Sequence, residues 1–125
     1  MDLYAGPVTG ARSILIVEDE PLIAMMLEDF LESLGHVVKA SCDNVADALQ
    51  AVAVDGFDIA ILDVNLKGEY VWPVATRLRQ LGVPFVLASG GHVEPPPPEF
   101  ADVPLIEKPY TIDRVAPALE AALAG

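Results

Sequence analysis

The stretch Ile14-Leu15-Ile16-Val17-Glu18-Asp19 places an uninterrupted apolar run directly before two acidic residues. Such a run is typical of a parallel strand that is covered on both faces. The run Ile59-Ala60-Ile61-Leu62-Asp63 repeats the pattern and also ends on a carboxylate. Between the two runs, apolar residues recur at helical spacing from Pro21 until Gly35, and these two residues are typical of a helix start and a helix stop.

The same alternation of strands and helices continues along the chain. Further strands are expected at residues 36–40, 84–88 and 103–106. Further helices are expected from a cap at Asp43 or Asn44 to residue 52, over residues 71–81, and from Thr111 or Asp113 to residue 123. Strands that alternate with helices indicate βαβ units and a parallel sheet, so the fold class is α/β.

Prolines interrupt this alternation between the fourth and fifth strands. Residues 95–98 are four consecutive prolines, and proline lacks the N–H that a helix needs and clashes with the preceding turn. The sequence predicts a polyproline-like loop with at most one short turn in place of a helix. Pro117 lies within the last helical pattern and predicts a kink or a late helix start.

Composition limits the class of protein. The chain has 125 residues, 53% hydrophobic residues and a formal charge of −12, which predicts one folded domain over residues 13–125 after a flexible leader over residues 1–12. The acidic charge disfavours nucleic acid and anionic membranes as partners, and no apolar run reaches the ~18 residues of a membrane span. The single cysteine, Cys42, is interpreted as a small half-buried residue, which fits a reducing, cytoplasmic setting.

Polar side chains stand where the predicted strands end. Glu18 and Asp19 follow the first strand, Asp63 the third, Ser89 the fourth and Lys108 the fifth. Because right-handed crossovers bring the carboxyl ends of parallel strands to one edge of a sheet, these side chains are expected to converge there.

The expected cluster has the chemistry of phosphoryl transfer. Carboxylates that crowd together need a cation or a proton, and hard oxygen ligands suit Mg²⁺ or the similar Mn²⁺. Asp63, on the central strand, is the best-placed nucleophile, since aspartyl phosphate is a known type of covalent intermediate. Lys108 would neutralise phosphoryl oxygens and Ser89 would donate a hydrogen bond to another.

Four motifs resemble those of response-regulator receiver domains, and they lie in the family's order. They are Ile14-Leu15-Ile16-Val17-Glu18-Asp19, Ile61-Leu62-Asp63-Val64-Asn65-Leu66, Leu87-Ala88-Ser89-Gly90 and Glu107-Lys108-Pro109. The resemblance covers the chain from Ser13 onward. It implies a doubly wound sheet of five strands in the flavodoxin-like order 2-1-3-4-5, with the helix between strands 4 and 5 reduced or replaced by the proline-rich loop.

The resemblance also implies roles for single residues. Asp63 would be the phosphoacceptor, and Asp19 a direct metal ligand with Glu18 acting through water. The backbone carbonyl of Asn65 would complete the metal site, and a cis peptide would join Lys108 to Pro109. The donor would be a sensor histidine kinase or a histidine phosphotransfer protein, and the output would be contact with a downstream protein or phosphate relay, as a monomer or a phosphorylation-dependent dimer. The chain would thus signal rather than turn over a metabolic substrate.

Two positions depart from the usual receiver pattern. The position three before Lys108 usually carries an aromatic switch residue, and here it is Leu105, whereas Tyr110 lies two residues after the lysine. Together with Pro84-Phe85 and Ala88-Ser89-Gly90-Gly91, Lys108-Pro109-Tyr110 resembles stand-alone receivers of the FAT GUY type. The resemblance therefore does not imply the usual coupling between a hydroxyl and an aromatic ring for this chain.

Several residues and functions have competing interpretations. The alternative functions are a metal-dependent phosphohydrolase, which usually has a second aspartate where Asn65 stands, and a pseudo-receiver that binds partners without phosphorylation. His36 and His92 are interpreted as structural or exposed, and Met25 and Met26 as core and core edge. Tyr70 and Trp72, after the Asp63 loop, are interpreted as packing or partner contact.

Overall fold

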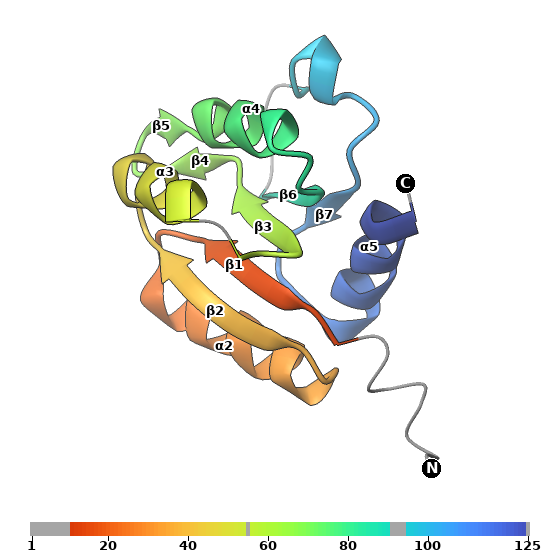
Figure 1. Ribbon diagram of the computed structural model, residues 1–125. Helices are drawn as coiled ribbons and strands as arrows, with labels where there is room; N and C mark the ends of the chain where they lie inside the picture. Colours follow the sequence, from red (N-terminus) through yellow and green to blue (C-terminus); the bar gives the residue numbers. More distant parts are fainter. Residues whose placement is uncertain (1–10, 55, 91–94, 125) are drawn as a thin grey trace.

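The computed structural model describes residues 11–54, 56–90 and 95–124, which form a five-stranded parallel sheet between two layers of helices (Figure 1). The strand order is β2-β1-β3-β6-β7, which is the predicted doubly wound order. The strands of this sheet are β1 (Ser13–Val17), β2 (Val37–Cys42), β3 (Ile59–Asp63), β6 (Phe85–Ser89) and β7 (Leu105–Glu107). The α-helices among these residues are α2 (Pro21–Ser33), α3 (Val45–Val54), α4 (Trp72–Gln80) and α5 (Ile112–Ala124). The predicted leader falls largely on residues 1–10, outside the described residues.

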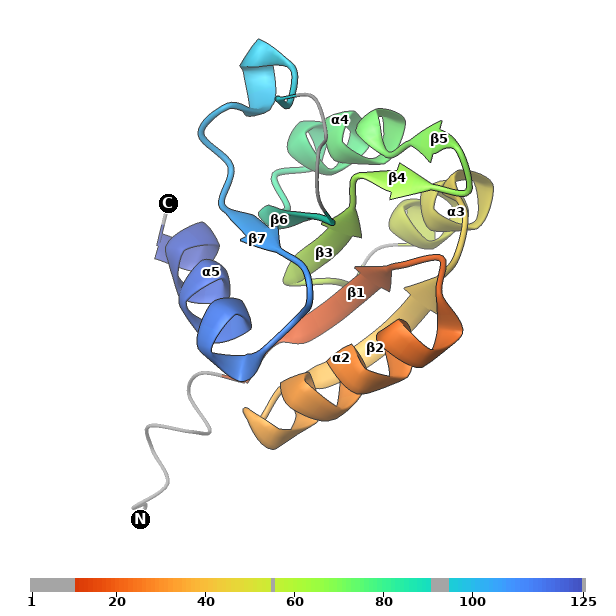
Figure 2. The same cartoon turned by 180° about the vertical axis from the view of Figure 1, so that it is seen from behind.

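The central strands β1, β3 and β6 are buried on both faces, because apolar residues follow one another along them and neighbouring residues of a strand point to opposite sides. On one face Ile16 and Ile61 pack with α2 and α5, and on the other Leu15 and Leu62 pack with α3 and α4. Figure 2 shows α2 and α5 together on the side away from α3 and α4. Both layers bury side chains completely, at about 1.5–3 kcal/mol for each large apolar group removed from water. The central strands are thereby fixed, and so are the loops that leave them.

Helix α2 begins at Pro21, as predicted, and the chain leaves it through Gly35, whose φ of +92° lies in the left-handed region. Its buried face consists of Ala24, Leu27 and Leu31. The interpretation of the methionine pair as core and core edge was wrong, because Met25 and Met26 are 60% and 37% exposed. These positions are rotated away from the stripe that faces the sheet, a direction that apolar character alone does not reveal.

Caps define the beginnings of the other predicted helices. Asn44 caps α3, since its Oδ1 accepts the N–H of Asp47 over 2.8 Å. Thr111 caps α5 by accepting the N–H of Arg114 over 3.2 Å. Helix α5 continues through Pro117, so the predicted late start was wrong. None of the helices in the described part of the chain is long and apolar enough to cross a membrane.

In its described residues, 95–104, the connection from β6 to β7 contains one short 3₁₀ turn, η2 (Pro98–Phe100), as the prolines predicted. Phe100 anchors this turn: its buried ring stacks on Trp72 with centroids 5.6 Å apart and meets Phe85 edge-on at 5.8 Å. Arg79 of α4 lies over the Phe100 ring and donates to the carbonyl of Glu99. The turn is therefore docked on α4 by the Phe100 ring and by the hydrogen bond from Arg79. His92 lies outside the described residues.

A small hairpin follows Asp63, where the sequence predicted a loop. Strand β4 (Asn65–Leu66) pairs antiparallel with β5 (Glu69–Tyr70) around a turn at Lys67 and Gly68. The side chain of Asn65 closes this turn, because its Oδ1 accepts the N–H of Gly68 over 3.0 Å. Two-residue strands are too short to show a period in the sequence, which explains why the pattern did not reveal them.

Candidate functional site

The register of the sheet sets the level of each polar side chain at its carboxyl edge. Val17 of β1 pairs with Leu62 of β3, so Glu18 and Asp63 follow at the same level on neighbouring strands. Asp63 pairs in turn with Ala88 of β6, and Ser89 with Glu107 of β7. The strand ends thus converge as the sequence predicted.

Lys108 joins two of the carboxylates. Its Nζ lies 2.7 Å from Glu18 Oε1 and 3.0 Å from Asp63 Oδ2. Its position is fixed from behind, because its backbone N–H donates to the carbonyl of Ser89 over 2.8 Å. Glu18, Asp63 and Ser89 are all buried polar residues at this edge. One ammonium is therefore held between two carboxylates that protein covers almost completely.

Burial dominates the proton affinities of this group. It raises the pKa of Glu18 to about 7, against the opposing effect of Lys108 and with the help of the Asp63 charge. Burial also raises the pKa of Asp63, although Lys108 opposes the rise. Burial alone would lower the pKa of Lys108, but the hydrogen bonds to Glu18 and Asp63 outweigh it and raise that pKa. The two buried carboxylates compete for one ammonium, so the group attracts a further positive charge.

The acidic side chains suit a divalent cation. One carboxylate oxygen from each of Glu18, Asp19 and Asp63 lies within 4.8 Å of the other two. Asp19 is partly exposed, whereas the other two are buried, so the cluster opens toward solvent on one side. All donors are hard oxygens in an open arrangement, which fits Mg²⁺ with retained water molecules.

The remaining predicted site residues lie beside this group. Asn65 is exposed two residues after Asp63, where its side chain serves the hairpin turn and its carbonyl belongs to the same loop. Ser89 is buried at the end of β6. The peptide bond between Lys108 and Pro109 is cis, as the resemblance implied.

The unusual aromatic pattern has a clear structural counterpart. Leu105 is half exposed on β7, whereas Tyr110 is buried. Lys108 Nζ lies 5.7 Å from the centre of the Tyr110 ring. Burial, followed by the charges of Glu18 and Asp63, raises the pKa of the Tyr110 hydroxyl. An aromatic ring therefore lies next to the lysine. It comes from a residue after Lys108 in the sequence, whereas the usual aromatic position of receivers lies before the lysine.

Two features of this edge were missed in the sequence. The first is the backbone N–H of Lys67, which donates to Asp19 Oδ2 over 2.9 Å. The second is the ion pair between Lys67 and Asp43, at 3.3 Å. The only sequence signal for either is Gly68, which marks a turn without giving its direction.

Comparison with known proteins identifies the family. Residues 14–99 match the family model of the response regulator receiver domain. The chain belongs to this family. The matched span contains Glu18, Asp19 and Asp63, and it ends within the η2 turn.

Individual receivers resemble the chain over most of its length. It is 54% identical to SdrG from Sphingomonas melonis Fr1, covering 90% of this chain and 96% of the other, with a TM-score of 0.81 to its solution structure. The BeF3-activated conformation of SdrG from Pseudomonas melonis Fr1 gives 53% identity, coverage of 89% and 95%, and a TM-score of 0.77. The transcriptional regulatory protein TcrA of Mycobacterium tuberculosis is 46% identical over 60% of this chain, which spans only 29% of that regulator's length.

Proposed function

We propose that the chain is a single-domain response regulator that accepts a phosphoryl group on Asp63 in a Mg²⁺-dependent reaction. The observation that carries this proposal is the placement of the Lys108 ammonium between the buried carboxylates of Asp63 and Glu18, at 3.0 and 2.7 Å. A single-domain protein is supported by the match to SdrG, 96% of whose structure the chain covers. Half-buried Cys42 suits a cytoplasmic setting.

The donor in this proposal is a phosphohistidine of a sensor kinase or of a histidine phosphotransfer protein. A carboxylate oxygen of Asp63 attacks phosphorus and the P–N bond breaks. The imidazole leaves with the electron pair of that bond, and it is neutral because its other nitrogen carries a proton. The acidic surface of the domain, with a formal charge of −12, favours a donor with a basic docking face.

Residues around Asp63 prepare this step. Glu18, Asp19, Asp63 and the carbonyl of Asn65 would hold Mg²⁺, which supplies charge neutralisation for the phosphoryl oxygens. Lys108 keeps Asp63 oriented and, after transfer, balances the added negative charge. Ser89, at the end of the neighbouring strand β6, would donate a hydrogen bond to a phosphoryl oxygen.

The output of this proposal is protein contact or phosphate relay. Ser89 is the last residue of β6, before the connection that carries η2, and Lys108 directly follows β7. The backbone N–H of Lys108 donates to the carbonyl of Ser89 over 2.8 Å. A change at Asp63 that draws on Lys108 and Ser89 therefore acts on β6, the η2 connection and β7. We assign the partner-binding change to this surface.

The test is intact-protein mass after incubation with acetyl phosphate, with and without Mg²⁺. Wild type should gain one phosphoryl group only with Mg²⁺, and Asp63→Asn should gain none. Asp58→Asn is the matched control, since Asp58 precedes the same strand at its other end and accepts the N–H of Ser13. Labelling of Asp63→Asn, or no labelling of wild type by either acetyl phosphate or a phosphorylated histidine phosphotransfer protein, would contradict the proposal.

A further inference from the structure

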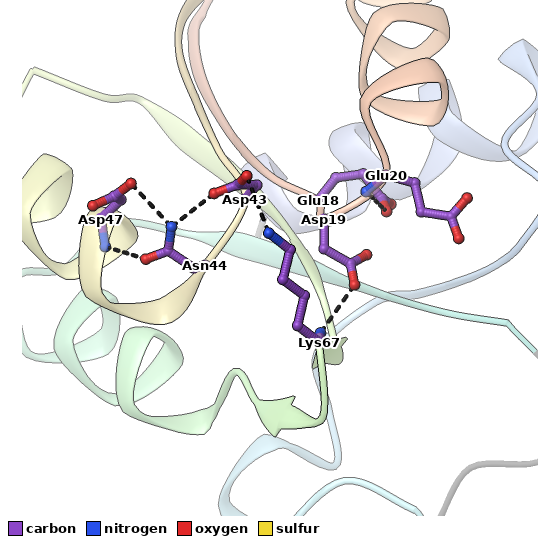
Figure 3. Close-up of polar contacts among 7 residues, drawn as sticks. All are labelled: Glu18, Asp19, Glu20, Asp43, Asn44, Asp47 and Lys67. Atoms are coloured by element: carbon purple, nitrogen blue, oxygen red, sulfur yellow. Dashed lines mark hydrogen bonds and ion pairs between the residues drawn. The ribbon is translucent and has the colours of Figure 1, made fainter.

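Lys67, in the turn of the β4–β5 hairpin, contacts two other loops at the site edge (Figure 3). Its backbone N–H donates to Asp19 Oδ2 over 2.9 Å, and its ammonium lies 3.3 Å from Asp43 Oδ2. Asp19 lies in the loop after β1 and Asp43 in the loop after β2. One residue therefore joins the hairpin that follows Asp63 to both neighbouring loops.

Asp43 continues this connection to the start of helix α3 (Figure 3). The side-chain amide of Asn44 donates to Asp43 Oδ1 over 2.7 Å and to Asp47 Oδ2 over 2.9 Å. Asn44 Oδ1 in turn accepts the N–H of Asp47 as the helix cap. An unbroken series of polar contacts thus leads from Lys67 to the first turn of α3.

The two contacts of Lys67 have separable origins. Its φ of +51° lies in the left-handed region, which a non-glycine residue adopts only where its surroundings hold it there. The hairpin turn, closed by the bond from Gly68 to Asn65, supplies that hold. The direction of the backbone N–H is therefore set by the turn, whereas the ion pair with Asp43 depends on the side chain. A substitution of the side chain removes the charge and keeps the N–H.

We propose that Lys67 couples cation binding in the acidic cluster to the loop that opens helix α3. A divalent cation on Asp19 competes with the Lys67 N–H for the carboxylate, and its charge repels the Lys67 ammonium. Cation binding therefore loosens the hairpin from Asp19 and from Asp43 together, and Lys67 lowers the affinity of the cluster for the cation. This inference rests on the cation site of the proposed function.

The test is a Mg²⁺ titration of the full chain, followed by the amide resonances. In wild type, the amides of Asn44 and Asp47 should shift as Mg²⁺ binds. In Lys67→Met these shifts should be lost, and the Kd for Mg²⁺ should fall about 2–5-fold, as expected when one charge near a divalent ion is removed at a protein surface. Lys67→Arg should resemble wild type.

Two further variants make the test specific. Lys39→Met removes the same charge from β2, where Lys39 donates to the carbonyl of Gly56 over 3.3 Å, and should leave the Kd and both shifts unchanged. Asp43→Asn breaks the ion pair from its other side. It should abolish the response at Asp47 and weaken Mg²⁺ binding, because it removes a negative charge.

Other outcomes overturn the inference. An equal or weaker affinity in Lys67→Met, or Asn44 and Asp47 shifts as large as in wild type, would show that Lys67 does not couple the two places. If Lys67→Met loses its folded amide dispersion, a retained Asp47 response in Asp43→Asn overturns the inference independently. Wild type that binds no Mg²⁺ would refute the cation site as well. If wild type binds Mg²⁺ and is phosphorylated, but Lys67→Met has the same Kd and the same amide shifts as wild type, the coupling is refuted and the cation site is not.

Discussion

Glu18→Gln should stabilise the metal-free protein at neutral and higher pH, although it removes a contact with Lys108. The Glu18 side chain is fully buried, and burial raises its pKa to about 7 from the ordinary value of 4.5. In the unfolded chain the same carboxyl ionises freely at neutral pH. Glutamine fills the same space, keeps an oxygen for Lys108 and has no charge to bury.

The sign of the effect follows from linkage between proton binding and folding. Because the folded pKa is the higher one, the stabilising contribution of the protonated carboxyl is complete below about pH 4.5 and is lost as the pH rises to about 7. At about 1.4 kcal/mol for each tenfold change in proton affinity, the upper bound of this loss is about 3.5 kcal/mol. Asp63 titrates together with Glu18, so we expect a gain of about 1–3 kcal/mol for Glu18→Gln at pH 8, falling to about half or less at pH 5.5.

The assay is urea unfolding with a metal chelator at both pH values, followed by the fluorescence of Trp72, the single tryptophan. Glu32→Gln on the exposed side of α2 is the control and should change the free energy of unfolding little at either pH. The reasoning fails if Glu18→Gln is no more stable than wild type at the higher pH. It also fails if the gain has the same size at both, since a gain without pH dependence cannot come from a buried ionisation.

Three further perturbations address the function, the connector and a helix cap. Lys108→Ala should still bind Mg²⁺ and accept a phosphoryl group, but phosphorylation should no longer change its affinity for the partner. If a pull-down titration finds the same difference between the phosphorylated and unphosphorylated variant as in wild type, this role is contradicted. Phe100→Ala should lower the free energy of unfolding by about 3 kcal/mol or more, because a buried aromatic ring is lost, and denaturant titration measures it. Asn44→Ala should cost about 1 kcal/mol in the same titration, since it removes the cap of α3.

Much of the fold follows from local sequence. Apolar runs that end on Asp19 and Asp63 predicted buried parallel strands, because such strands have no polar face. Pro21 and Gly35 predicted the limits of α2, and the four prolines predicted the short turn η2 in place of a helix over the described residues of the connection. These signals are short-range: each depends on what the backbone at one place can adopt, so a single sequence contains them.

Long-range contacts could not be predicted in the same way. The sequence predicted that Glu18, Asp63 and Lys108 lie at one edge of the sheet. It did not predict that the Lys108 ammonium bridges the two carboxylates. The contact of Lys67 with Asp19 depends on a turn whose strands are two residues long, and no periodicity marks it. The exposure of Met25 depends on how α2 is rotated on the sheet. Such features are set by packing between elements rather than by any one element.

The composition of the buried group argues for chemistry rather than stability as the reason for its presence. Glu18, Asp19 and Asp63 together carry two more charges than Lys108 neutralises when all four are ionised, which is the charge that a divalent cation supplies. Apolar residues of similar size in place of Glu18, Asp63 and Lys108 together would remove the desolvation cost and give a more stable domain. A fold that keeps two competing carboxylates around one ammonium at the ends of its most buried strands accepts that cost. It thereby holds a site whose charge a divalent cation balances and a single proton balances only in part.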